Sequence, residues 1–295
     1  HVSFEGLDMQ KENIVRRVVG FNHKDGTIKP SMIQAAVSNL QGTGLFTEVN
    51  YRLEGAEAPY RVVFVVKEKS MNSIGLGVRF DSEEMAAVLL NATFSTRKLK
   101  HSMFGITARL SENPYGELKW SYGSDLSRKL SLSYMFKYNK QSLYYKGDKQ
   151  SNMDFGNHKV DLSYSNIRIK NLRLTVGLRF DYYDYHSLLT NDVWHVDLHS
   201  QGIVSYYGLI QYESLDRRHN PRKGASLEFG ASLNTSNFVN YKGDSPYSAI
   251  HFNYLMAISV SKRVTFLPGA FGRVLVGEQI AYPSLNLMGG TVPGR

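Results

Sequence analysis

Three observations predict that this is a mainly β protein, with an antiparallel transmembrane β-barrel preceded by a small α+β domain. Residues 70–295 alternate apolar and polar side chains in about eleven segments and show no helical periodicity. Several segments reach about ten residues, the length that a tilted strand needs to cross hydrocarbon. Residues 1–69 instead mix short strands with two helical patterns. We therefore divide the chain into an N-terminal domain, 1–69, and a barrel, 70–295.

The N-terminal domain begins with a short strand and two helices. Residues Val2 to Glu5 alternate like a strand, and Gly6 ends it. Two amphipathic helices follow, and Pro30 stands near the start of the second. Their apolar positions, at helical spacing, are Ile14, Val15, Val18 and Val19 in the first helix and Met32, Ile33, Ala36, Val37 and Leu40 in the second.

The second helix is followed by a turn and two strands. Gly42 and Gly44 stop the helix, and Leu45 and Phe46 lead into a strand at 46–53. A Glu-Gly-Ala-Glu-Ala-Pro turn separates that strand from a second one, residues 60–68. The predicted order is therefore βααββ.

The barrel prediction depends most on residues 172–182. Even positions there are Leu, Leu, Val, Leu, Phe and Tyr, whereas odd positions are Arg, Thr, Gly, Arg and Asp. One face of this strand is apolar and the other is charged, which a dry protein core would not tolerate. The same alternation recurs at residues 130–138, 225–233 and 250–260, and more weakly at 88–94, 104–110, 118–122, 160–164 and 204–212. The first strand is expected near 74–80 and the last near 264–276.

A soluble β-sandwich also alternates, and an ordinary secreted all-β domain is the alternative. Tyrosines gather at expected strand ends, in 181–185 and 205–207, where membrane barrels carry aromatic girdles. No stretch approaches eighteen apolar residues, so no transmembrane helix is predicted. The net charge of +9 is scattered and accompanies no nucleic-acid-binding motif, so we expect contacts with anionic outer-membrane lipid or a positive lumen, and no nucleic-acid partner.

The N-terminal residues resemble a POTRA domain. The matching phrases are Val2-x-Phe4-x-Gly6-Leu7, Ile33-x-x-Ala36-x-x-x-Leu40, Gly42-Thr-Gly-Leu-Phe46-x-x-Val49 and Val62-Val-Phe-Val-Val66. The turn of Gly42, Gly44, Leu45 and Phe46 is the most specific part. Such domains lie in the periplasm before barrels of the BamA/TamA superfamily of assembly and translocation proteins. The resemblance therefore implies a Gram-negative outer-membrane protein whose N-terminal domain is periplasmic.

Two barrel segments resemble the same superfamily. The Asp216-Arg-Arg-His-Asn220-Pro221-Arg-Lys-Gly224 segment is similar to its Asp…Asn-Pro…Lys-Gly turn, although Pro and Gly are also ordinary hairpin residues. The C-terminal segment carries Gly289, Gly290, Gly294 and Arg295. The superfamily has a loop at this point whose arginine, beside a glycine, folds into the lumen to pair with acidic side chains. Arg295 would match it, but here the glycine precedes the arginine. A solvated glycine-rich loop is the alternative.

An odd set of strands cannot close a bacterial barrel, because an open edge leaves unpaired amides in lipid. We therefore expect an incomplete barrel, with about five further strands after Arg295 implied by the resemblance. If the barrel were complete, its edge would have to pair with another chain, for example in a homodimer.

The residues of this chain predict no enzyme active site. There is no Gly-x-Ser-x-Gly elbow, phosphate loop or paired-carboxylate site, so we expect no catalytic residue, cofactor or metal. His195 and His199 are better explained by an aromatic belt than by a metal site. The carboxylate pairs Glu83-Glu84 and Asp181…Asp184 are predicted at turns, as solvated charge.

Residues 71–82, directly after one POTRA-like domain, are similar to the C-terminal half of Bacteroidetes patatin-like phospholipases. That resemblance implies a patatin hydrolase upstream, with this chain as its membrane anchor and export unit. The alternatives are an assembly or translocation factor proper and a non-translocating, porin-like barrel. In the first two, a substrate polypeptide would meet the POTRA edge and a barrel seam.

Overall fold

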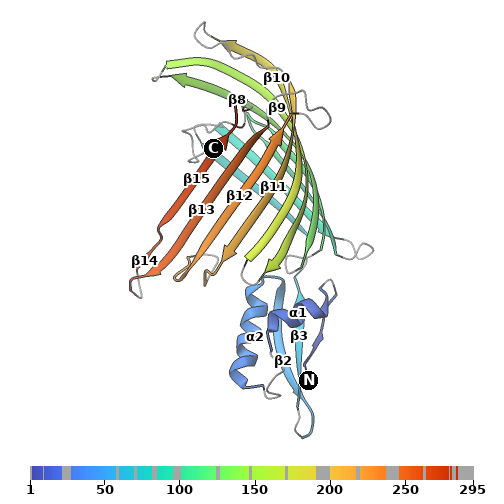
Figure 1. The fold of residues 1–295 in the computed structure, drawn as a ribbon. Coiled ribbons are helices and arrows are strands. Elements are labelled where there is room, and N and C mark those ends of the chain that lie inside the picture. Colours follow the sequence, from blue (N-terminus) through green and yellow to red (C-terminus); the bar gives the residue numbers. More distant parts are fainter. Residues whose placement is uncertain are drawn as a thin grey trace.

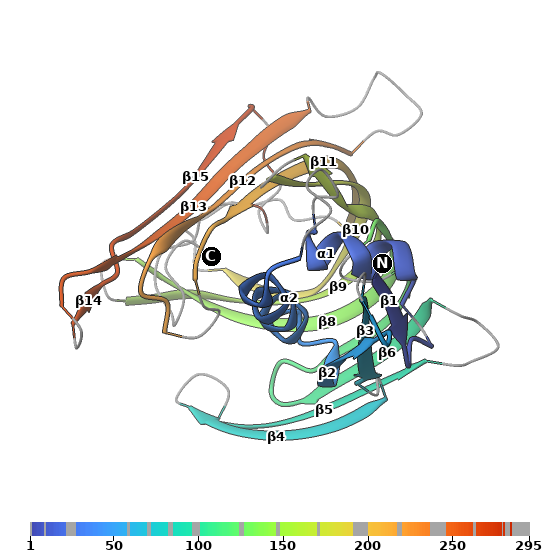
Figure 2. The ribbon, with the colours of Figure 1, turned by 90° about the horizontal axis from the view of Figure 1, so that it is seen from below.

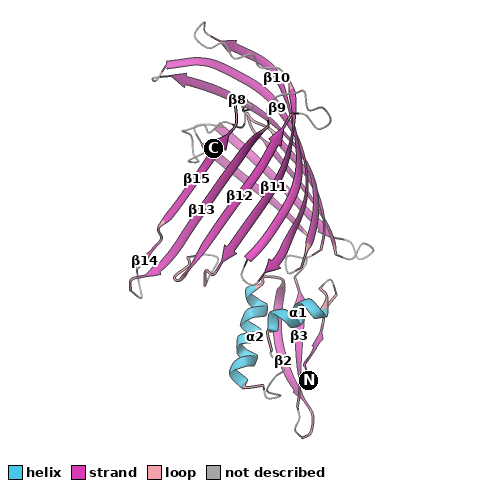
Figure 3. Ribbon diagram, in the orientation of Figure 1, coloured by secondary structure: helices cyan, strands magenta, loops and turns pink. Residues whose placement is uncertain are grey.

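The chain folds into two separate β-sheets, which lie one below the other in Figure 1. The computed structural model describes residues 2–8, 10–21, 28–57, 60–69, 72–81, 85–95, 101–123, 127–145, 148–169, 172–190, 200–216, 220–236, 246–261, 264–278, 280 and 284. Both helices accompany the smaller sheet (Figure 3). No helix in these ranges is long and apolar enough to cross a membrane.

The smaller sheet and its helices form what we call the N-terminal module. Its elements are β1 (Val2–Glu5), α1 (Glu12–Val19), α2 (Pro30–Gly42), β2 (Phe46–Glu54) and β3 (Arg61–Glu68). The observed order is the predicted βααββ. The strands lie in the order β1-β3-β2, with β1 parallel and β2 antiparallel to the central β3.

The core of this module lies between the sheet and the two helices. Phe64 of β3 is fully buried and stacks on Phe4 of β1, with ring centroids 5.6 Å apart. Val15 and Leu40 bring the two helices onto the same core, where both side chains have no exposed surface. These are the apolar positions that recur at helical spacing in the sequence.

The larger sheet is antiparallel throughout and follows the order of the chain. Its strands are β4 (Ser73–Asp81), β5 (Met85–Ser95), β6 (Ser102–Leu110), β7 (Tyr115–Tyr122), β8 (Lys129–Tyr145), β9 (Asp148–Ile169), β10 (Leu172–Thr190), β11 (Gln201–Glu213), β12 (Gly224–Thr235), β13 (Tyr247–Ser259), β14 (Thr265–Phe266) and β15 (Gly269–Val276). From β4 to β13 each strand pairs with its neighbours in sequence, and both β14 and β15 pair with β13.

The last edge of this sheet is one strand broken in two. We expected a continuous strand over 264–276, but Pro268 separates β14 from β15. Proline has no N–H to donate to the ladder, so it is confined to edges and bulges. Its carbonyl still accepts a 2.9 Å hydrogen bond from the Met256 amide. Counted as one edge, β14 and β15 bring the strand number to the predicted eleven.

The two faces of the larger sheet have opposite chemistry. Leu178, Phe180 and Tyr182 are 37–42% exposed. Asp181 and Tyr183, at the alternate positions of the same strand, are only 6–8% exposed. We call the apolar face the outer face and the opposite one the inner face. The same contrast holds on most strands from β6 to β12, as the alternation predicted, whereas on β5 the consecutive Leu89 and Leu90 are 41% and 44% exposed.

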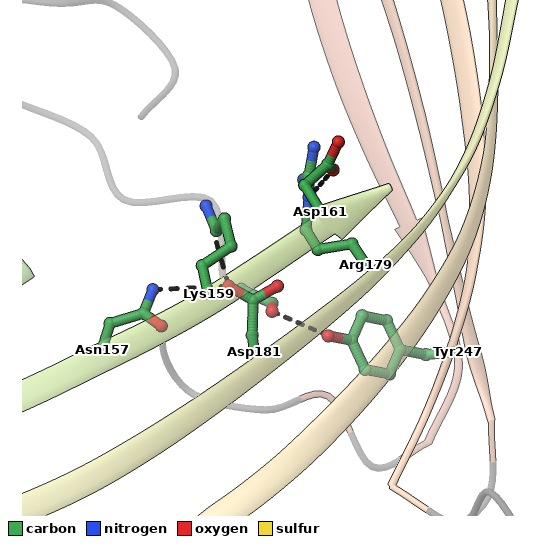
Figure 4. Close-up of polar contacts among 7 residues, drawn as sticks. Asn157, Lys159, Asp161, Arg179, Asp181 and Tyr247 are labelled. Atoms are coloured by element: carbon green, nitrogen blue, oxygen red, sulfur yellow. Dashed lines mark hydrogen bonds and ion pairs between the residues drawn. The ribbon is translucent and has the colours of Figure 1, made fainter. Parts of the chain in front are cut away.

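The inner face is concave. Tyr247 begins β13, three strands from β10, yet its hydroxyl points at the Asp181 carboxylate (Figure 4). Neighbouring strands are about 4.8 Å apart, so three steps across a flat sheet would span roughly 14 Å, beyond the reach of a tyrosine. Only a strongly curved sheet brings them together, and Figure 2 shows this curvature from below. Within the described residues β4 and β15 are not paired with each other, so this sheet is open.

One turn prediction was wrong. Asp181 and Asp184 lie inside β10, because the alternation continues past the Asp-Tyr-Tyr-Asp-Tyr run instead of ending there. The strands β8, β9 and β10 have 17, 22 and 19 residues. A bilayer crossing needs only about 9–11 residues. Figure 1 shows these strands extending past the others at the end opposite the N-terminal module.

Candidate functional site

The inner face carries a connected polar cluster on β9, β10 and β11. Arg179 donates from Nε to Oδ2 of Asp161 at 3.0 Å, and the Tyr207 hydroxyl donates to Oδ1 of the same carboxylate at 2.9 Å. The Arg179 guanidinium also lies 4.9 Å from the centroid of the Tyr207 ring. Each carboxylate oxygen of Asp161 therefore has a partner, and three strands are linked through one acid.

A glycine makes this link possible. Tyr207 of β11 pairs with Gly177 of β10, yet it bonds to Asp161 on β9, one strand further. A Cβ at Gly177 would lie 2.3 Å from Cζ of Tyr207, so the ring occupies the space that any side chain would fill. Close approach of this kind is one reason for glycine inside a strand.

A second group lies next to the first on the same wall. Asp181 is 3.6 Å from Nζ of Lys159 and accepts a 3.4 Å hydrogen bond from the Asn157 amide. The Tyr247 hydroxyl approaches Asp181 from across the concavity and is also 2.7 Å from Oγ of Ser284 (Figure 4). The two groups together hold two acids and two bases, so their formal charges balance.

This arrangement provides a wall of paired charges on the inner face. In the part of the chain that the structure describes, no group of three or more His, Cys, Asp or Glu side chains could hold a metal ion. The carboxylates of Asp161 and Asp181 are engaged by the cations of Arg179 and Lys159, and the Tyr207 hydroxyl also donates to Asp161. The wall can therefore bind water and polar groups along its length.

The structure brings the predicted hairpin residues together at the β11–β12 turn. Oδ1 of Asp216 accepts hydrogen bonds from the backbone amides of Arg222 and Lys223, at 2.8 and 3.2 Å. Asn220 and Gly224 have positive φ, +52° and +104°, as tight turns require. The turn lies at the end of the sheet that faces the N-terminal module (Figure 1). Pro221 lies within the loop that Asp216 closes.

The predicted core turn of the N-terminal module lies where α2 meets β2. Gly42 is the last residue of α2, and Gly44 has φ +70°. The Leu45 carbonyl accepts from the Lys69 amide at 2.8 Å, and Phe46 is 7% exposed in the core. The turn thus joins the end of α2 to one end of the β2–β3 pair, where β2 begins and β3 ends.

Other predicted residues lie outside the described part of the chain. They are Gly289, Gly290, Gly294 and Arg295 of the expected lumen loop, together with Glu83, Glu84, His195 and His199.

An ion-pair network across the sheet of the N-terminal module was not predicted from the sequence. Arg52 of β2 reaches across the central strand β3, where Val63 is 1% exposed, to Glu5 of β1 at 2.7 Å. It also pairs with Glu54 of its own strand at 2.8 Å. The hydrogen bond to Glu54 and the charge of Glu5 hold the pKa of the Arg52 guanidinium above its ordinary value. The residues are 47 positions apart, so no local pattern could have shown the pair.

No family model and no curated protein matches this sequence. Solved structures do match its fold. BamA from Haemophilus ducreyi lacking POTRA domains 1–3 has a TM-score of 0.63 at 15% identity, over 98% of this chain and 58% of that one. CdiB from Escherichia coli has a TM-score of 0.55 at 14% identity, over 94% and 54% of the two chains. CdiB from Acinetobacter baumannii has a TM-score of 0.53 at 11% identity, over 98% and 55%.

The chain spans somewhat more than half the length of these solved structures. Each match covers nearly all of this chain, so it includes both the N-terminal module and the larger sheet. At these identities the likeness concerns the fold and not the residues. The chain therefore has the fold of a BamA-like β-barrel, mainly antiparallel β, with a small α/β module at one end.

Proposed function

We propose that this chain is an outer-membrane β-barrel with a periplasmic POTRA-type module, and that it handles polypeptides in transport or assembly. The observation that carries the proposal is the two-faced curved sheet, apolar outside and charge-paired inside, with a module at one end that has its own open sheet edge. BamA and CdiB, the solved structures of like fold, support it.

The exposed surface supports a membrane environment. The chain exposes 19824 Å². A compact soluble protein of 33.4 kDa exposes about 12,600 Å². The outer face contributes leucine, valine and aromatic surface, for example at Leu132, Leu162 and Phe252, which are 42–43% exposed. A continuous apolar patch of this extent is unfavourable in water and favourable in hydrocarbon.

The β2 edge of the N-terminal module is where an incoming chain would dock. In the β1-β3-β2 order, β2 pairs only with β3 among the described strands, so its other edge can accept a strand by β-augmentation. Tyr51 and Leu53 on this strand are 45% and 55% exposed, and they offer apolar contacts to a docked segment.

The test is site-specific photo-crosslinking in the native bacterium. A photoreactive phenylalanine analogue at Tyr51 on the β2 edge is expected to crosslink to newly secreted polypeptide. The same analogue at Gln34, exposed on α2, serves as the control. Equal labelling from both positions, or none from Tyr51, contradicts a role for the β2 edge.

The identity of the crosslinked chain separates two versions of the proposal. We favour the membrane-anchor and export unit of a patatin-like phospholipase, which the resemblance of residues 71–82 supports. Crosslinks confined to an upstream hydrolase, and an intact native mass with room for it, are expected in that case. Crosslinks to many outer-membrane proteins, with further POTRA domains upstream, indicate an assembly factor instead.

A porin-like barrel is the remaining alternative. Purified full-length protein in planar bilayers would then give steady ion conductance, and Tyr51 would give no polypeptide crosslinks. The module argues against this alternative, because a simple porin needs no polypeptide-binding edge at its mouth.

A further inference from the structure

A cavity of about 430 Å³ lies between the N-terminal module and the lower end of the larger sheet. On the module side it is lined by the start and one face of α1. On the other side it is lined by the β7–β8 turn and by residues next to the β5–β6 and β9–β10 turns. Figures 1 and 2 show α1 next to the lower ends of these strands.

The charged side chains that line this cavity, among the residues that the structure describes, are all basic. Lys11 and Arg17 line it from the module, and Arg128 and Arg168 line it from the sheet. No Asp or Glu belongs to its lining among the described residues. A cleft lined by one sign of charge focuses the field and concentrates ions of the opposite sign.

The neighbouring arginine on α1 has a different environment. Arg16 pairs with Glu12 at 2.7 Å and donates to the Val2 carbonyl at 2.9 Å, so its charge is matched within the module. Arg17 donates from Nε to the Asn13 carbonyl of its own helix at 3.4 Å. That hydrogen bond uses only Nε of the Arg17 guanidinium, and its acceptor is a neutral carbonyl and not a carboxylate.

A buried polar atom also lines the cavity. Gln10 is 6% exposed, and its Oε1 has no hydrogen-bond partner in the described part of the chain. Ile14 and Arg17 are three residues apart on one face of α1, and Gln10 lies two residues before the helix begins. An unpaired buried carbonyl oxygen is unfavourable, and a hydroxyl or ammonium group of a ligand would satisfy it by donating a hydrogen bond.

We propose that this cavity binds the phosphate-bearing headgroup of a glycerophospholipid, with the phosphate among the four cations and a headgroup hydroxyl or ammonium donating to Gln10. Tyr122 lines the cavity and ends the outer-face row of β7, where it is 48% exposed. Tyrosine is enriched at membrane–water interfaces, so this rim lies at headgroup level. The inference rests on the proposed outer-membrane location and adds a lipid ligand to it. A bound headgroup would hold the module against the barrel mouth.

Binding is measured on the detergent-purified full chain by native mass spectrometry and by titration with short-chain phosphatidylglycerol below its micelle concentration. The cavity variant is Lys11→Gln with Arg17→Gln. The matched control is Lys29→Gln with Arg61→Gln, which removes the same two charges from exposed positions of the same module. At about fivefold per cation, the cavity variant should bind roughly 25-fold more weakly, and the control within about twofold of wild type.

A second pair, Arg128→Gln with Arg168→Gln, should lose a similar factor, because the cations of both sides would contact one phosphate. Inorganic phosphate is titrated in parallel. If phosphate alone binds as tightly as the lipid, the site takes a free anion and the lipid assignment is wrong. Equal lipid binding by wild type and the cavity variant also overturns it.

Failure of the outer-membrane proposal is detected separately, by partition of the chain between buffer and lipid vesicles. Soluble short-chain lipid still reports on the cavity in that case. Circular dichroism of each variant shows whether a loss of binding comes from loss of fold.

Discussion

The structure predicts that Gly6→Ala detaches β1 from the N-terminal module. Gly6 has φ +85°, a left-handed conformation that costs a residue with a side chain about 1–2 kcal/mol. A Cβ built on it would lie 1.9 Å from the Val66 carbonyl oxygen and 3.1 Å from its carbon. Real contacts of this kind stay beyond 3.0 Å, so the backbones must separate by 3.0 − 1.9 = 1.1 Å or more.

That separation acts at the end of the parallel β1–β3 pair, where Glu5 is in register with Val65. Strain and lost pairing together should cost about 3 kcal/mol of local stability. Two other glycines separate the contributions. Gly20→Ala, with φ +71° and no atom nearer than 3.9 Å to its Cβ, should cost about 1 kcal/mol. Gly42→Ala, in α2 with open space around it, should stabilise by about 0.5–1 kcal/mol.

Hydrogen exchange of the full chain in detergent, resolved by peptide, measures these effects. At tenfold per 1.4 kcal/mol, amides of β1 in Gly6→Ala should exchange roughly 100-fold faster than in wild type. Amides at the end of α1 in Gly20→Ala should exchange about fivefold faster. If the two variants change exchange by the same factor, the contact with Val66 is not the dominant cost and this reasoning is wrong.

Three further predictions concern the larger sheet. Asp161→Asn weakens the Arg179 ion pair and should lower unfolding stability by about 2 kcal/mol. Glu213→Gln removes an exposed pair with Arg173 and should lower unfolding stability by about 0.5 kcal/mol or less. Equal shifts of the urea midpoint in the Asp161 and Glu213 variants would contradict this difference, which comes from the deeper burial of Asp161. Leu178→Arg on the outer face should cost about 2–4 kcal/mol at the bilayer midplane, whereas Thr175→Arg on the inner face should fold normally. The folded fraction of both variants is measured by heat-modifiable mobility on gels. If the Leu178 and Thr175 variants fold to the same extent, the assignment of outer and inner faces is wrong. Asp216→Ala should speed exchange of the Arg222 and Lys223 amides about fivefold and leave the β7–β8 turn unchanged.

Much of the fold could be predicted because its signals are local. Helical spacing placed Val15 and Leu40 in the module's core, and period-two alternation placed Leu178 and Phe180 on one face of β10. Strand ends were less predictable. The run from Asp181 to Tyr185 has the composition of a turn, but its alternation continues and the strand extends to Thr190. Periodicity was the better guide there, because turn residues also occur on the polar face of a barrel strand.

The polar contacts of the inner wall could not be predicted from the sequence. The Tyr207–Asp161 bond joins residues 46 positions apart and depends on the register of three strands. Gly177 is the one sequence signal, because a glycine in an otherwise perfect strand suggests a close approach, but it does not say of what. Tyr247 reaches Asp181 only because the sheet curves, and curvature is a property of the whole sheet.

Charge is distributed unequally along the axis of the molecule, and this bears on the proposed function. On the inner wall Asp161 and Asp181 are matched by Arg179 and Lys159, so a polypeptide passing these two acids would meet paired charges. At the rim beside α1, four cations stand without a carboxylate in the described cavity lining. Electrostatic binding of anions is therefore expected to be strong at the rim and weak beside the paired acids of the wall, because unpaired charges attract ions more strongly than matched pairs do. A channel that bound its substrate tightly along its whole length would release it slowly, so the rim beside α1, away from the inner wall, is the favourable place for the lipid contact that holds the module.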